Sequence, residues 1–142
     1  MSLSELLLYC FTDSLLVALL LPIQDYTAIL AVKAFHSYSI PLVIISSFLG
    51  LNLAVIVNVF LGKFFMLAFK IPTPTDDMTT KFAKISKFFR KYLSSLLIFA
   101  PFPIFGALVV VFFGAISKNL KQLFLISLSG NLIYLVGYFY LY

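Results

Sequence analysis

A proline interrupts a long apolar stretch between Leu15 and Asp25, in the segment LLVALLLPIQD. Proline removes a backbone donor and clashes with the preceding turn, so a helix entering this segment should break near Pro22. At membrane depth such a break is tolerated only where protein or a water-filled cavity surrounds it. A carboxylate at that depth is costly and counts as a functional candidate. We therefore predict a re-entrant helical hairpin with Asp25 at its tip.

The composition places this break inside a membrane. The 142 residues are 63% hydrophobic and 11% charged, with a mean hydropathy of +1.12. A soluble domain is about half apolar and about a quarter charged. We expect a single integral membrane domain over residues 1–142. The lone cysteine, Cys10, should pack as a small apolar residue, and the acidic N-terminal stretch lacks the basic region of a signal peptide.

The first half of the chain predicts a hairpin followed by a spanning helix. Residues 3–21 form one apolar limb, and residues 23–36 form a second limb that is too short to cross a bilayer of about 30 Å by itself. Pro41 then opens an apolar run to about residue 69, with no charge before Lys63. Proline is well placed in the first turn of a helix. This run is the clearest spanning helix.

Two asparagines lie inside that spanning helix, at Asn52 and Asn58. An asparagine in lipid hydrogen-bonds across a helix interface, and small residues such as Gly50 and Gly62 let helices approach closely. Packing contacts and a substrate-facing role explain the asparagines equally well.

The second half repeats this order. Residues 93–100 form an apolar limb, Pro101 and Pro103 break it, and residues 104–116 form the next limb. Residues 122–142 make a last spanning helix.

A basic amphipathic helix is expected between the halves, after a loop at residues 71–80. Apolar residues recur at helical spacing from 81 to 92, with cations between them. Such a helix lies in the headgroup plane against anionic lipid. The flanking membrane helices argue against nucleic acid as its partner. The cations assigned to the membrane surface are Lys81, Lys84, Lys87, Arg90 and Lys91.

Together these elements predict an all-α membrane protein built of two inverted repeats, residues 3–69 and 92–142, joined by a cytoplasmic segment at 70–91. If each hairpin returns to its side of entry, each half crosses the membrane once, so the halves are inverted, as in transporters whose sites lie at the midplane. Nearly all cations then lie on one face, which the positive-inside rule makes cytoplasmic. These are Lys63, Lys70, Lys81, Lys84, Lys87, Arg90, Lys91, Lys118 and Lys121, whereas Lys33 falls on the other face.

Three stretches resemble the DedA family, also called SNARE-associated Golgi or VTT-domain proteins, and most closely its small YqaA-like branch. They are LLLPIQD at 19–25, LGLNLAVIVNVFLGK at 49–63 and PIFGALVVVFFGAISKNLKQLFLISLSGN at 103–131. The chain has Asp25 where that branch has a glutamate and Lys63 where it has an arginine. Ala107 follows Gly106 where an acid is usual, and the last helix lacks the usual basic residue. These departures from the family pattern argue against a fully proton-coupled mechanism.

The resemblance implies lipid movement, such as return of a polyprenyl phosphate or scrambling of phospholipids, and location in the bacterial inner membrane. Two polar breaks meeting near the midplane would give a headgroup a path while its tails stay in hydrocarbon. Asp25 would take up a proton or cation, and Lys63 or the linker cations would receive a phosphate. The residues assigned to translocation are Pro22, Asp25, Asn52, Asn58, Lys63, Pro101, Pro103 and Gly106.

Two other functions stay open. A proton- or cation-linked transporter of small solutes would use Asp25 as its ion site. In a non-transporting assembly factor, Asp25 would only cap the second limb, since an acid at a helix N-terminus is stabilised by the helix dipole. We expect no enzymatic activity, cofactor or metal, because His36 has no cluster of ligands at metal spacing. A homo-oligomer is expected, because so few helices shield a polar path poorly.

Overall fold

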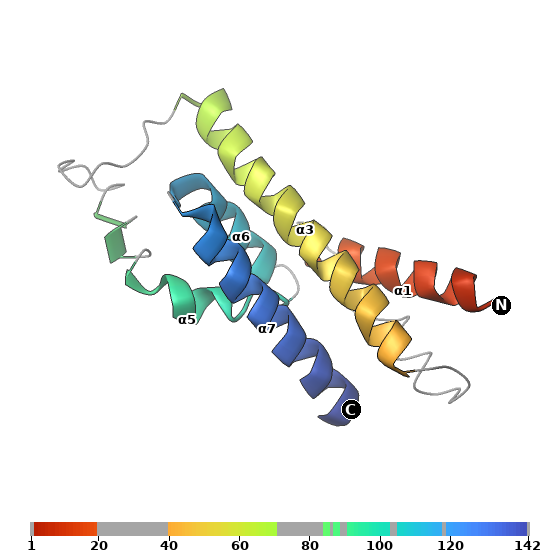
Figure 1. Ribbon diagram of the computed structural model, residues 1–142. Coiled ribbons are helices and arrows are strands. Elements are labelled where there is room, and N and C mark those ends of the chain that lie inside the picture. The colour runs from red at the N-terminus through yellow and green to blue at the C-terminus, as the bar shows by residue number, and fades with distance from the viewer. Residues whose placement is uncertain are drawn as a thin grey trace.

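All elements of the described structure are helices. The computed structural model describes residues 2–19, 40–70, 84–85, 87–88, 91–102, 105–117 and 119–141. Figure 1 shows one long helix, α3, with α1 beside its first part and with α6 and α7 against its other face. The helices are α1 (Leu3–Ala18), α3 (Ile40–Ala68), α5 (Leu93–Leu97), α6 (Phe105–Ile116) and α7 (Leu120–Leu141).

Two helices are long and apolar enough to cross a bilayer. They are α3, with 29 residues, and α7, with 22. Only 33% of the most apolar part of each is buried in the molecule, whereas the core helix of a soluble protein is mostly buried. Large apolar side chains are exposed along α3, among them Leu49, Phe60 and Leu67 at 56%, 67% and 78%. A surface this apolar indicates association with a membrane.

The helices α1 and α3 run parallel. The Ser46 hydroxyl donates to the Leu7 carbonyl, and the Asn58 amide donates to the Ala18 carbonyl, so the contacts join residues 39 or 40 positions apart along the whole of α1. Gly50 lies between them, and a Cβ there would come under 3.0 Å from the Phe11 carbonyl oxygen. The end of α1 beside Leu19 and the start of α3 at Ile40 therefore lie at opposite ends of the contact between the two helices.

The segment around α5 runs parallel to α7 in the same way. Gly130 packs on Ile98, where a Cβ would lie 3.1 Å from the Ile98 carbonyl oxygen. One turn further along both segments, the Phe102 and Tyr134 rings lie 5.4 Å apart.

The two long helices run antiparallel to each other. Asn52 of α3 bonds Asn131 of α7. Leu51 packs in one cluster with Leu135, and Val59, further along α3, packs in another with Leu123, which is earlier on α7. The direction of the two helices in Figure 1 agrees.

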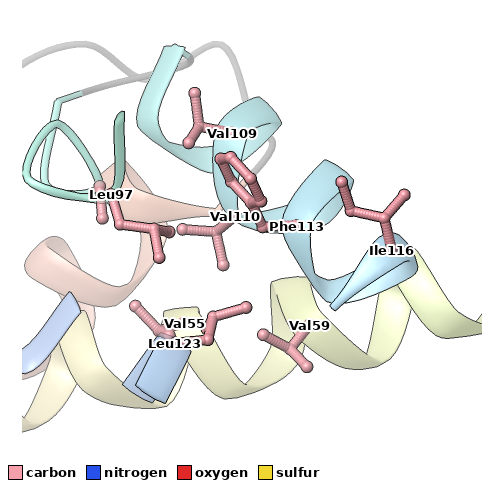
Figure 2. Packing of buried hydrophobic residues seen from close by; sticks show 9 residues of the cluster. Val55, Val59, Leu97, Val109, Val110, Phe113, Ile116 and Leu123 are labelled. Carbon is pink, nitrogen blue, oxygen red and sulfur yellow. The ribbon is translucent and has the colours of Figure 1, made fainter. Parts of the chain in front are cut away.

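The largest cluster of buried residues joins α6 to the second half of α3. Figure 2 shows Val55 and Val59 of α3 pointing toward Val110 and Phe113 of α6, with Leu123 of α7 beside them. The backbones approach at glycines: Gly114 packs on Val59, and Gly62 packs on Val111. In water, burial of these apolar side chains would contribute roughly 25 cal/mol per Å² of apolar surface. In lipid, the helices are held together by close van der Waals packing instead.

The predicted spanning helices at 41–69 and 122–142 correspond to α3 and α7, and the limb at 104–116 corresponds to α6. The first limbs were predicted too long. Helix α1 ends at Ala18 with Leu19 extended, rather than at residue 21, and α5 ends at Leu97 rather than at 100. Cys10 is a buried free cysteine, as predicted. The second limb at 23–36 and the loop at 71–80 lie outside the described residues.

Candidate functional site

The end of α1, called the first break below, is stabilised by Asn58. In a continuing helix the Ala18 carbonyl would accept from the backbone N–H of residue 22, but Pro22 has none. The Asn58 side-chain amide, 1% exposed, donates to that carbonyl at 2.9 Å instead. This bond therefore satisfies the carbonyl at the end of α1. Asn58 thus lies beside the end of α1, from which the chain continues toward Pro22 and Asp25, both outside the described residues.

The second break follows the same rule with a different partner. Helix α5 ends at Leu97, four residues before Pro101. Here the Ala100 backbone N–H bonds the Leu97 carbonyl at 3.0 Å, and Pro101 is buried. Gly106 closes the turn, because a Cβ at this position would collide with the Ala100 carbonyl. Pro103 lies outside the described residues.

An asparagine pair joins the middles of the two long helices. The Asn131 amide donates to the Asn52 side-chain oxygen at 3.1 Å, and Asn52 donates to the Phe48 carbonyl at 2.6 Å. Asn131 is 1% exposed. The second break reaches the same level, because Ile98 packs on Gly130, the neighbour of Asn131. Asn58 lies only six residues further along α3 than Asn52, about 9 Å at ~1.5 Å per residue.

Several polar atoms near these contacts are buried without a hydrogen-bond partner in the described part of the chain. They are Oδ1 of Asn58 and Asn131 and the hydroxyls of Ser14, Ser47 and Ser127. An unpaired buried group costs about 1–3 kcal/mol. The amide oxygens are acceptors and the serine hydroxyls can donate or accept, so this region can form hydrogen bonds with a polar group that enters it.

Ser47 and Ser127 were not among the predicted site residues. Each is fully buried and lies three residues before a glycine that touches its neighbouring segment, Gly50 or Gly130. The shared spacing, serine followed three residues later by glycine, is the sequence signal that could have found them. It also places Ser47 and Ser127 at corresponding positions in the two halves.

The structure does not bring all predicted site residues together. Asn52 and Asn58 take part in the contacts above, as do Pro101 and Gly106. Lys63, in contrast, is exposed and lies on a different side of α3 from the buried Asn58.

The basic segment is exposed where the structure describes it. Lys84, Lys87 and Lys91 are exposed, and Lys91 lies over the Tyr92 ring at 5.7 Å. Its apolar residues are exposed too, with Ile85 at 48%, Phe88 at 58% and Tyr92 at 41%. A face that no described residue covers is what a helix lying in the headgroup layer would present. Lys81 and Arg90 lie outside the described residues.

No protein-family model matches the chain, and no curated protein or solved structure matches it.

Proposed function

We propose that the chain is an integral membrane protein of two inverted repeats, each a re-entrant hairpin followed by one spanning helix. Three observations support this. In each half the first limb runs parallel to the long helix that follows it, and it ends four residues before a proline. The long helices α3 and α7 run antiparallel. Because α1 runs parallel to α3, the end of α1 lies far from the start of α3, an arrangement that is compatible with a hairpin between them.

We further propose that it moves lipid headgroups across the membrane, with anionic lipid as its partner. The observation that carries this is the level of the two breaks. Both lie close to the Asn52–Asn131 pair, where several buried polar atoms have no hydrogen-bond partner among the described residues. The serine hydroxyls there could donate to a headgroup phosphate and the amide oxygens could accept from a headgroup hydroxyl or ammonium, while the lipid tails stay against the exposed apolar side chains of α3. Polar groups at the midplane beside interrupted helices are typical of transport sites.

Asp25 is the proposed ion or proton site of this path. It follows Ala18, the partner of Asn58, by seven residues in the sequence. An acid at membrane depth is costly unless it has such a role. Lys63 and the exposed linker lysines would receive a phosphate at the cytoplasmic surface.

Membership of the DedA family, and with it location in a bacterial inner membrane, is part of this proposal. Its support lies in the stretches that carry the resemblance. Gly50 and Gly62 in the second stretch, and Gly106 and Gly114 in the third, are the points of close backbone approach. Glycine at these places is therefore a requirement of the packing.

A lipid-flip assay tests the function. The purified protein is reconstituted into vesicles with a fluorescent lipid, and an impermeant reductant reports how fast inner-leaflet lipid becomes accessible. We expect Asp25→Asn to slow flipping by about tenfold, equivalent to ~1.4 kcal/mol of barrier. Gly137→Ala is the control, because no atom of the described residues lies within 4 Å of a Cβ placed there.

Flipping that is unchanged in Asp25→Asn and Lys63→Gln would remove the roles assigned to these residues. Proton-driven solute flux without lipid movement would identify a small-solute transporter instead.

A further inference from the structure

An apolar pocket of about 470 Å³ lies between the second half of α3, α5 and the length of α6. We call it the phenylalanine pocket. Its lining includes Gly62, Phe65 and Met66 of α3 and Phe105, Leu108 and Phe113 of α6. Every residue lining it is apolar, and its volume is in the range of pockets that hold small ligands.

The phenylalanine pocket has a buried floor and an exposed rim. Met66 and Phe113 are 8% and 0% exposed, whereas Phe65, Phe105 and Leu108 are 42%, 53% and 51% exposed. The rim continues into the exposed apolar side chains of α3, such as Phe64 at 64%. The pocket is therefore open on a side of the molecule that would face lipid, and hydrocarbon is the matching occupant.

Charge at one end of the pocket adds a preference for the headgroup. Lys63 follows Gly62 directly, and Lys70 lies one turn beyond Met66, where α3 has ended. Both lysines are exposed. The acids that the structure describes, Glu5 and Asp13, are both on α1, which packs against the opposite end of α3. A lysine stem can lie along apolar surface while its ammonium reaches the headgroup layer.

We propose that the phenylalanine pocket holds one acyl chain of an anionic phospholipid from the surrounding bilayer, with the headgroup at Lys63 and Lys70. This lipid is a resident ligand, because the pocket lacks polar lining and is separate from the asparagine pair. The proposal rests on the membrane placement given above, and it does not depend on transport.

Fluorescence quenching tests this in the full chain. The sequence has no tryptophan, so one introduced residue is the only such reporter. Leu108→Trp places it at the rim, and Phe105→Trp is a second reporter should the first fold poorly. Leu49→Trp, exposed near the other end of α3, is the matched control. Each variant is reconstituted with phosphatidylglycerol or phosphatidylcholine that carries bromine on its acyl chains.

The pocket reporters should be quenched at a lower mole fraction of brominated phosphatidylglycerol than of phosphatidylcholine, by about fivefold for each lysine that contributes. Lys63→Gln with Lys70→Gln should abolish this preference. Ala115→Leu, which fills part of the pocket, should reduce quenching by either lipid. The control reporter should show no preference.

Equal quenching of pocket and control reporters by both lipids would overturn the proposal. So would protection of the reporter that grows with protein concentration, since a second copy would then cover the pocket. Measuring flipping in the same vesicles separates the two proposals: a chain that does not flip lipid but keeps the quenching preference retains this site.

Discussion

In each half of the molecule the first limb runs parallel to the long helix, but the contacts between limb and helix differ. In the first half, α1 is 16 residues long and is bonded to α3 at both ends, by Ser46 to Leu7 and by Asn58 to Ala18. In the second half, α5 has five residues, and the end of α5 with the turn after it meets α7 at Gly130 and through a ring contact of Phe102. One arrangement of limbs can therefore be stabilised by hydrogen bonds across helices or by aromatic packing.

The largest difference is expected at the two matched glycines. Gly50→Ala forces its Cβ into the backbone of α1, and overpacking of this kind costs about 3 kcal/mol. Gly130→Ala meets Ile98 at 3.1 Å, a mild crowding that the better helix propensity of alanine offsets by about 1 kcal/mol. Unfolding in detergent can be followed by a thiol-reactive dye, because the single cysteine, Cys10, is fully buried.

Gly137→Ala serves as the control and should be neutral or slightly stabilising, since the new Cβ would contact none of the residues that the structure describes. Equal losses at Gly50 and Gly130 would show that the two halves are packed alike, contrary to the contrast drawn above.

The two breaks should also differ in their dependence on side chains. Asn58→Leu leaves the Ala18 carbonyl buried without a donor, which costs about 2 kcal/mol. The second break carries no such risk, because the backbone of Ala100 bonds the Leu97 carbonyl. Denaturant unfolding, with the labelling rate of Cys10 under native conditions, measures the effect. Unchanged stability and labelling in Asn58→Leu would mean that this bond does not hold α1 in place.

A double-mutant cycle would sharpen the link between the halves. Asn52 and Asn131 join α3 to α7 by a side-chain bond of 3.1 Å. Such bonds between membrane helices contribute about 1 kcal/mol. Asn52→Ala and Asn131→Ala should therefore be non-additive by about that amount in their free energies of unfolding. Additive losses would indicate that each asparagine acts alone.

The smallest effect is expected at the start of α1. Ser2 and Glu5 form a reciprocal capping box, whereas Tyr92, before α5, makes no side-chain capping bond. Ser2→Ala should cost about 1 kcal/mol or less, seen as faster hydrogen exchange in the first turn of α1. Exchange in α7 should not change, and a change there would imply that α1 and α7 unfold as one unit.

The sequence was sufficient to predict the long helices, because α3 has no charge before Lys63 and α7 has none after Lys121. It did not predict where the first limbs end. Helix α1 ends at Ala18 and α5 ends at Leu97, each four residues before a proline that cannot donate to that carbonyl. The residues between the end of each helix and the proline are apolar, so the sequence pattern alone does not mark these earlier ends.

The candidate site was predictable only in part. Asn52 and Asn58 stand out as polar residues in an apolar helix, but their partners depend on the register between helices. The Ala18 carbonyl and Asn131 are 40 and 79 residues away. Ser47 and Ser127 were missed because a serine in an apolar helix is ordinary, and only its burial in the fold distinguishes it.

The parallel register of α1 and α3 has a consequence for biosynthesis. Leu7 and Ala18 of α1 have to wait for partners that leave the ribosome 39 and 40 residues later. At about 5–20 residues per second that delay is roughly 2–8 s. During this time the buried Asp13 and Ser14 have no α3 to cover them. The insertion machinery therefore has to protect the first half of the nascent chain early. The second half docks onto an α3 that is already made and needs less protection.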